Sequence, residues 1–227
     1  MDSSRAAATV TVDEFRVADP PDAWAQAGFR VDADGICRVG AVRLSLVGRG
    51  HGSGIVGWTL RGLPSGGGDV DGIPTTSSDE VPTVSSDTAA FPPAPHANGV
   101  IGIDHVVLMS PDLDRTVTAL IACGTRPRRT RDAELGGRPV RQVFFRLGEV
   151  ILEVVGSPDT TGNGPSTLWG ITYAVTDIEQ TAAFFDGRTG PVKDAVQPGR
   201  RITTLRNLEF GMSVRTAMIS APYPRTP

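Results

Sequence analysis

Along residues 99–222, apolar and polar positions alternate in short runs separated by helical patterns, as half-buried strands and amphipathic helices require. The run IDHVVLMSPDLDRTVTALIACG, from Ile103, predicts a strand and then a helix that is capped at Ser110 and ends at Gly124. Residues 140–156 then alternate as two strands about a turn do. This part of the chain therefore predicts a unit of one strand, one helix and further strands.

The same order returns elsewhere in the chain, which indicates internal repetition. Residues 169–185 predict a strand and a helix capped at Asp177, and residues 200–220 predict two strands. Towards the N-terminus, VDEFRVADPPDAWAQAGF (12–29) aligns with IDHVVLMSPDLDRTVTAL, and VGAVRLSLVG (39–48) aligns with LGEVILEVVG. This copy is shorter, so we expect it to have lost a strand or to use tighter turns.

Between the repeats, residues 64–98 are rich in Gly, Pro, Ser, Thr and Asp, and IPTTSSD is nearly repeated as VPTVSSD. They offer too few apolar side chains to offset the entropy of ordering the backbone. We therefore predict a degenerate N-terminal βαβ-type module over residues 8–63, a flexible linker or long loop over 64–98, and a domain of two modules over 99–222.

Composition excludes several classes of protein. The chain has 22 basic and 25 acidic residues, so its net charge of −3 argues against a nucleic-acid partner. No apolar run approaches the roughly 18 residues that a spanning helix needs, which argues against a membrane partner. The N-terminal residues lack an apolar core of signal-peptide length, so we expect a cytoplasmic protein. Two cysteines make no disulfide framework.

The basic residues are distributed unevenly. Lys193 is the only lysine and all the others are arginine, which we attribute to GC-rich codon usage; anion binding by planar guanidinium groups is the alternative. Arg126, Arg128, Arg129 and Arg131 lie within six positions. Such a cluster is typical of a solvated strand edge, and a contact with a phosphate or an acidic ligand is the sharper interpretation.

The stretches GIDHVVLMSPDLDRT, FFRLGEVILEVVG and WGITYAVTDI, in this order and spacing, resemble the vicinal oxygen chelate superfamily, also called glyoxalase/bleomycin resistance/extradiol dioxygenase. They cover residues 100–222, and the N-terminal copy extends the likeness weakly. The resemblance implies an α+β fold of paired βαβββ modules whose curved sheets enclose a cup. In metal-dependent members, two facing modules supply ligands to a divalent metal that holds vicinal oxygens of the substrate.

The resemblance puts His105 and Glu153 at the ligand positions of the first module, where Zn, Ni, Mn or Fe would bind. In the second module, Tyr173 aligns with His105, and Thr216 or Ala217 aligns with Glu153, so the metal site is incomplete. A metal-free site is the alternative, with His105 and Glu153 as an acid–base pair and Tyr173 as proton donor or orienter. A buried hydrogen-bonded trio left from an ancestral site also fits the pattern.

Other polar residues are candidates for binding the substrate. Gln142 and Arg146 lie four positions apart on one strand and therefore share a face. Of the adjacent Arg200 and Arg201, one should point inward and the other outward. An inward arginine favours a carboxylate or phosphate ligand, and exposure at the strand end is the alternative.

These residues predict a glyoxalase-like protein that acts on a small oxygenated metabolite by isomerase, lyase or epimerase chemistry, or as a relative of the dioxygenases. A metal-free protein that binds or sequesters a small molecule is the second hypothesis. A structural dimerisation module is the third. The resemblance is also compatible with a homodimer, since part of the superfamily pairs modules between chains.

Overall fold

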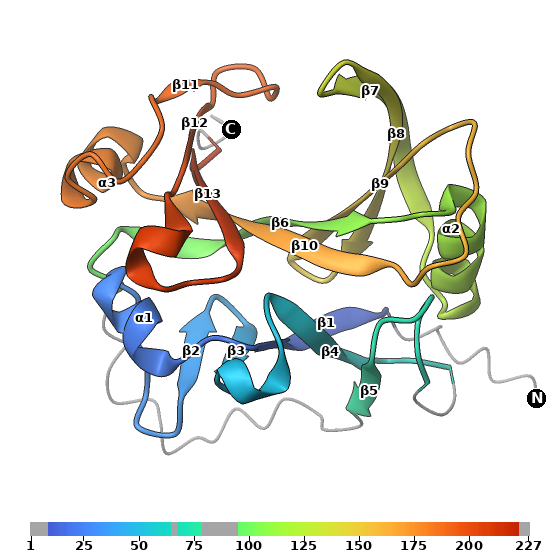
Figure 1. Ribbon diagram of the computed structural model, residues 1–227, viewed down its shortest axis with the longest axis horizontal. Coiled ribbons are helices and arrows are strands. Elements are labelled where there is room, and N and C mark those ends of the chain that lie inside the picture. Colours follow the sequence, from blue (N-terminus) through green and yellow to red (C-terminus); the bar gives the residue numbers. More distant parts are fainter. Residues whose placement is uncertain (1–8, 65–67, 79–94, 223–227) are drawn as a thin grey trace, which may run out of the picture.

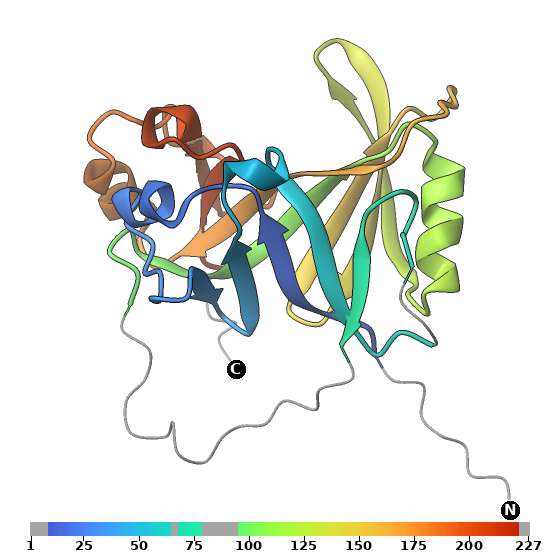
Figure 2. The ribbon, with the colours of Figure 1, turned by 60° about the horizontal axis from the view of Figure 1, so that its bottom comes forward.

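The protein is built from two β-sheets stacked face to face (Figures 1 and 2). The computed structural model describes residues 9–64, 68–78 and 95–222. The smaller sheet comes from the N-terminal part of the chain and lies in front in Figure 2, and the larger one comes from the C-terminal part. Within these ranges, no helix is both long enough and apolar enough to cross a membrane.

The C-terminal sheet consists of two βαβββ modules. The first contains β6 (Val100–Met109), α2 (Leu113–Ala122), β7 (Pro127–Leu135), β8 (Arg138–Leu147) and β9 (Val150–Gly156). The second contains β10 (Thr167–Val175), α3 (Ile178–Phe184), β11 (Lys193–Asp194), β12 (Arg201–Thr204), the 3-10 helix η3 (Asn207–Phe210) and β13 (Arg215–Ser220). The strand order is β11-β12-β13-β10-β6-β9-β8-β7. The predicted α+β fold of paired βαβββ modules is therefore confirmed.

Pairing within this sheet repeats between the modules. The first strand of each module runs parallel to the last, β6 with β9 and β10 with β13, and antiparallel pairing of β6 with β10 joins the two modules. Figure 1 shows that the two ends of the sheet, β7–β8 and β11–β12, curl away from the N-terminal sheet. The far face of the C-terminal sheet is therefore concave and forms the expected cup.

The N-terminal sheet is an abbreviated copy. It contains β1 (Thr11–Val17), β2 (Ile36–Val39), β3 (Val42–Leu46), β4 (Ile55–Arg61) and β5 (Thr75–Ser78), together with α1 (Pro21–Gln26) and the 3-10 helix η1 (Arg49–His51). Its order is β2-β3-β1-β4-β5, with β1 parallel to β3 and antiparallel to β4. The module β1-α1-β2-β3 has one strand fewer than a complete βαβββ module.

Part of the stretch predicted as a linker belongs to this sheet. Strand β5 pairs in parallel with β4, and a bridge joins Val70 to Ile73 just before it. Val70 and Ile73 are both buried, so these few apolar residues are enough to hold residues 70–78 against the core. The rest of the predicted linker, residues 79–94, lies outside the described residues.

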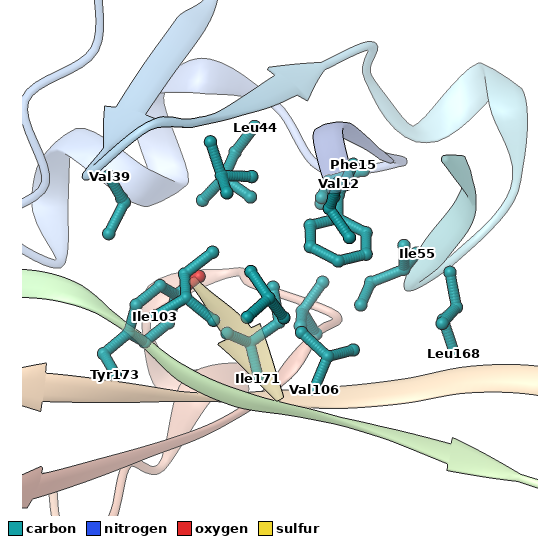
Figure 3. Close-up of a cluster of buried hydrophobic side chains, with 14 of the residues drawn as sticks. Val12, Phe15, Val39, Leu44, Ile55, Ile103, Val106, Leu168, Ile171 and Tyr173 are labelled. Atoms are coloured by element: carbon teal, nitrogen blue, oxygen red, sulfur yellow. The ribbon is translucent and has the colours of Figure 1, made fainter. Parts of the chain in front are cut away.

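The two sheets share one hydrophobic core, shown in Figure 3. Phe15 and Leu44 reach into it from the N-terminal sheet, and Val106, Ile171 and Tyr173 reach into it from the C-terminal sheet. Side chains alternate between the two faces of a strand, so the neighbours of these residues are left for the concave face. One face of the C-terminal sheet therefore supplies packing and the other is free to carry polar chemistry.

Helices α2 and α3 start at side-chain caps, but one predicted cap is wrong. Helix α2 begins after Asp112, whose carboxylate accepts a hydrogen bond from the Arg115 amide at 3.0 Å. Ser110, the predicted cap, lies two residues too early, and its hydroxyl instead accepts from the Asp112 amide at 3.1 Å. Helix α3 begins after Asp177 as predicted, because that carboxylate accepts from the backbone amides of the first turn.

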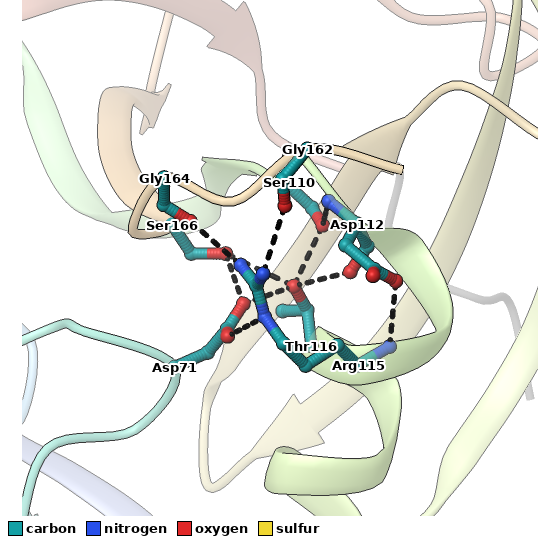
Figure 4. A network of polar contacts seen from close by, with 8 residues as sticks. All are labelled: Asp71, Ser110, Asp112, Arg115, Thr116, Gly162, Gly164 and Ser166. Atoms are coloured by element: carbon teal, nitrogen blue, oxygen red, sulfur yellow. Dashed lines mark hydrogen bonds and ion pairs between the residues drawn. The ribbon is translucent and has the colours of Figure 1, made fainter. Parts of the chain in front are cut away.

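A polar network ties the loop before β5 to helix α2 (Figure 4). The Asp71 carboxylate accepts hydrogen bonds from Arg115 Nε at 2.5 Å, from Ser166 Oγ at 2.6 Å and from the Thr116 hydroxyl. Arg115 also donates to the carbonyl oxygen of Gly162 at 2.9 Å. Asp71 thus fastens the N-terminal part of the chain to helix α2 of the first module and to the segment just before β10.

Candidate active site

The site is built around an irregularity in β6. Across the β6–β10 pair, His105 faces Thr172 and Ile103 faces Tyr173, so Asp104 has no cross-strand partner and forms a bulge. Bulges re-aim side chains next to functional sites. Here Ile103 packs in the core, whereas Asp104 and His105 both make polar contacts away from it, with side chains 10% and 13% exposed. The side chains of two consecutive residues therefore lie on the same face of the sheet.

Asp104 orients His105. Nδ1 of His105 lies 2.8 Å from Oδ1 of Asp104, and Nη1 of Arg200 lies 2.6 Å from Oδ2. Burial raises the pKa of Asp104, but the hydrogen bonds and charges of His105 and Arg200 outweigh it, so the pKa lies below the usual value of an aspartate. An ionised carboxylate only accepts hydrogen bonds, so this contact suits the imidazole tautomer that carries its proton on Nδ1.

Glu153 faces the other nitrogen of the imidazole. It lies on β9, diagonally across from His105, because Val107 pairs with Glu153 and His105 pairs with Ile151. Glu153 Oε2 lies 3.7 Å from His105 Nε2, and the carboxylate is 14% exposed. This distance is longer than a hydrogen bond, so no hydrogen bond joins Nε2 to Glu153. The lone pair of Nε2 therefore has no donor from the carboxylate side.

Arg200, Asp104, His105 and Glu153 form a line of polar side chains across the sheet. Gln142 and Arg131 extend this line towards the edge of the sheet. The Gln142 side-chain amide donates to Oε1 of Glu153, and its own oxygen accepts from Arg131 Nε at 2.7 Å. Arg131 belongs to the arginine cluster of the edge strand β7, and it alone of that cluster reaches inward through this contact. The line therefore runs across the concave face from β7 to the start of β12.

The prediction that Tyr173 serves this site is wrong. Its ring lies in the core, with its centroid 5.1 Å from that of Phe29 and 6.5 Å from that of Trp24. Burial above all raises the pKa of the hydroxyl well above its usual value, which keeps the group neutral. The bulge explains the error: the extra residue Asp104 leaves His105 on the concave face, whereas β10 has no extra residue there, so the aligned Tyr173 stays on the core face.

The predicted arginines separate into two groups. Arg200 is the inward member of its pair, 11% exposed and bound to Asp104, whereas Arg201 points outward and pairs with Glu179 of α3. Arg146 is exposed at the end of β8, where its Nε donates to the carbonyl oxygen of Gly148 at 2.9 Å. Arg146 and Arg201 therefore lie apart from the line that contains Gln142 and Arg200.

Sequence reasoning missed Asp104 and Arg131 as site residues. Asp104 directly precedes His105, and simple strand alternation sends neighbours to opposite faces, so only the bulge brings them together. Arg131 stood out as part of an arginine cluster, but its cross-strand neighbour Gln142 could not be inferred without the register of β7. The sequence feature that could have revealed both residues was a charge near a predicted site residue.

An open pocket of about 450 Å³, solvent space included, is lined by Thr172, the cross-strand partner of His105, and by Val107, two residues further along β6. Ala217 and Trp169 also line it, and Trp169 is 46% exposed. The guanidinium group of Arg215 lies over the Trp169 ring, 4.9 Å from its centroid. The pocket combines an aromatic wall with a nearby cation, features that bind small organic molecules.

The donor set does not fit a divalent metal held by the protein alone. His105 and Glu153 are the donors from the first module, and the second module places Thr172 and Ala217 beside them, neither of which is a usual ligand. The Asp104 carboxylate already forms an ion pair with Arg200. In residues 9–64, 68–78 and 95–222, no three His, Cys, Asp or Glu side chains gather as a metal site would require.

Comparison with solved structures establishes the class of fold. The chain is similar to a mutant of 4-hydroxymandelate synthase from Streptomyces coelicolor, with 16% identity and a TM-score of 0.58 over 97% of this chain and 95% of that one. It is similar to a catechol 2,3-dioxygenase, with 12% identity and a TM-score of 0.57 over 96% and 91%. It also resembles a xylose isomerase-like TIM barrel/4-hydroxyphenylpyruvate dioxygenase fusion protein, with 14% identity and a TM-score of 0.62 over 100% and 52%.

These likenesses show the fold, and the protein has the vicinal oxygen chelate fold that the sequence resemblance predicted. No protein-family model and no curated protein matches the sequence significantly. The fold alone does not define a reaction, so the chemistry must be argued from the site.

Proposed function

We propose that the protein is a vicinal oxygen chelate enzyme that moves a proton at a carbon next to a carbonyl group of a small oxygenated metabolite. Isomerases, epimerases and lyases share this step. The observation that carries the proposal is the 3.7 Å separation between His105 Nε2 and Glu153 Oε2 on the concave face, where Thr172, the strand neighbour of His105, lines an open pocket. Paired titratable groups of this kind, here with side chains only 13% and 14% exposed, are suited to acid–base catalysis.

His105 is the base in this proposal. Its Nε2 lone pair takes the proton, the C–H bond breaks, and the bonding electrons move to the carbonyl oxygen to form an enolate. The resulting imidazolium lies between the carboxylates of Asp104 and Glu153, which stabilise its charge. Delivery of the proton from His105 to a neighbouring carbon completes an isomerisation without any other reactant, whereas an epimerisation needs a second acid that protonates the opposite face of the enolate.

The surrounding groups suit a small anionic substrate. Gln142 uses one N–H on Glu153, so its second N–H is free to reach the enolate oxygen. Arg131 adds positive charge next to Gln142, which favours a substrate with a carboxylate. The remainder of the substrate lies against Val107 and Trp169 in the pocket.

The proposal is tested by hydrogen–deuterium exchange at carbon. The chain is incubated in D₂O with a panel of small 2-oxo acids and hydroxy ketones, and loss of the C–H signals next to the carbonyl is followed by proton NMR. We expect exchange of at least one compound, reduced about 10²–10⁴-fold in His105→Ala. His51→Ala is the matched control, because His51 is exposed in η1. Equal exchange in His105→Ala and the unmodified chain overturns the proposal.

A small-molecule binding protein without turnover is the second candidate, favoured by the pocket beside Trp169. Trp24 and Trp58 are fully buried, so Trp169 is the tryptophan whose fluorescence a ligand in the pocket would change. A compound that changes this fluorescence without any exchange at carbon supports the binding protein over the enzyme.

A further inference from the structure

We propose that Asp104 is a positioning residue that fixes His105 in the tautomer with its proton on Nδ1, and that Arg200 of the second module holds Asp104 in place. This inference rests on the proposed function, in which His105 Nε2 is the base. It concerns the tautomer and not the ionisation of the imidazole.

Both oxygens of Asp104 are committed. Oδ1 accepts from His105 Nδ1 at 2.8 Å and Oδ2 accepts from Arg200 Nη1 at 2.6 Å, and all three side chains are 10–13% exposed. Each contact lies in the range of a strong charge-assisted hydrogen bond. The carboxylate cannot rotate to release one partner without losing the other, so the imidazole ring is held with Nε2 towards Glu153.

Arg200 is itself anchored. Its Nε donates to the carbonyl oxygen of Ser220 at the end of β13, at 2.7 Å. Among the described residues, its Nη2 is one of a few buried side-chain polar atoms without a hydrogen-bond partner. An arginine with an unpaired buried N–H costs stability, which favours a role beyond filling space. The second module, which places no histidine or carboxylate beside His105, thus contributes the group that orients its support.

The N-terminal sheet offers an internal comparison. Asp13 occupies a similar irregularity in β1, where the register with β4 shifts between Val12 and Glu14. It binds Arg43 at 2.7 Å and Arg61 at 2.5 Å, and the next residue is Glu14 in place of a histidine. An aspartate–arginine pair at this position therefore also occurs without an imidazole, so a purely structural role is the alternative that the test must separate.

The test reads the tautomer directly. The chain contains three histidines, so ¹⁵N–¹H correlation spectra of histidine-labelled protein, recorded with the imidazoles uncharged, resolve each ring. We expect Nδ1–H for His105 in the unmodified chain. In Asp104→Asn, the new amide oxygen binds Arg200 and its NH₂ faces Nδ1, so the tautomer inverts to Nε2–H. Nε2–H in the unmodified chain, or Nδ1–H in both proteins, overturns the inference.

Kinetics separate this inference from the proposed function. For a compound that exchanges, Asp104→Asn should lower kcat about 10²–10⁴-fold and change KM by less than about threefold. Arg200→Lys, which keeps the charge near Asp104, should recover most of the Nδ1–H signal that Arg200→Met loses. A tautomer that inverts as expected while no compound exchanges contradicts only the proposed function. A fall in kcat with an unchanged tautomer contradicts only the positioning role.

Discussion

Nε2 of His105 and Oε2 of Glu153 lie 3.7 Å apart on the adjacent parallel strands β6 and β9, on the face of the sheet opposite the core. If Glu153 stabilises the imidazolium formed during turnover, Glu153→Gln removes that charge without changing the shape of the side chain. We expect kcat/KM for exchange at carbon to fall about 10²-fold or more. Glu134→Gln on the exposed edge strand β7 is the matched control and should match the unmodified chain. An active Glu153→Gln variant would refute the assigned role.

Tyr173 should be dispensable for catalysis. Its hydroxyl is one of the buried polar atoms without a partner in the described part of the chain, and burying such a group costs stability. Tyr173→Phe should therefore keep the exchange activity and leave the free energy of unfolding unchanged or raised by about 1 kcal/mol. Urea unfolding and the exchange assay check both. A loss of activity at unchanged stability would restore the predicted catalytic role of this residue.

Stability should fall in acid through Asp71. Burial raises the pKa of its carboxyl, but hydrogen bonds from Arg115, Ser166 and Thr116 outweigh this and hold the pKa below the usual value. In the unfolded chain the pKa of this carboxyl is about 3.9, so as pH falls the unfolded state binds the proton before the folded state does. The contribution of Asp71 is complete above that value and is lost as pH falls through the lower pKa of the folded state.

Asp71→Asn tests this linkage. The variant should be less stable by about 1–3 kcal/mol at about pH 6, because the hydroxyls of Thr116 and Ser166 lose an ionised acceptor. Between about pH 6 and about pH 3, it should lose less stability than the unmodified chain. Urea unfolding at the two pH values provides the comparison. Parallel losses in both proteins would show that Asp71 does not carry the acid dependence.

Chelators should not affect exchange at carbon. The donors beside the pocket are His105 and Glu153, and the second module adds Thr172 and Ala217 to them. Protein treated with a chelator should keep its rate within about twofold, and added Mn, Ni, Zn or Fe should not raise it, since two protein ligands bind such ions weakly. A rate that a chelator abolishes and one of these ions restores would show that substrate or water completes a metal site.

The sequence was sufficient to predict the modules, because each repeats the same alternation of strand and helix patterns and carries recognisable caps such as Asp177. The resemblance also singled out His105 and Glu153, which the structure places on adjacent strands. It could not locate the bulge at Asp104, since nothing in the local pattern of β6 marks an extra residue. That extra residue put Asp104 and His105 on the same face, whereas the regular alternation of β10 keeps Tyr173 in the core, so the errors at both positions have the same cause.

The linker prediction failed in part for a related reason. Val70, Asp71 and Ile73 are only three residues in a stretch rich in Gly, Pro and Ser. A prediction from the average composition of the stretch therefore overlooks them. Their partners, Ser166 and Arg115, lie far along the chain. Long-range contacts of this kind do not show in a local pattern, and they decide where the chain is held.

The most direct test of the central claim is a double-mutant cycle on His105→Ala and Glu153→Gln, measured as the rate of exchange at carbon in D₂O. Groups that act on one proton as a unit are strongly non-additive. The account predicts that the double variant is no slower than the slower single variant within about threefold. Single-variant losses that multiply in the double variant would contradict it, because the two groups would then act independently.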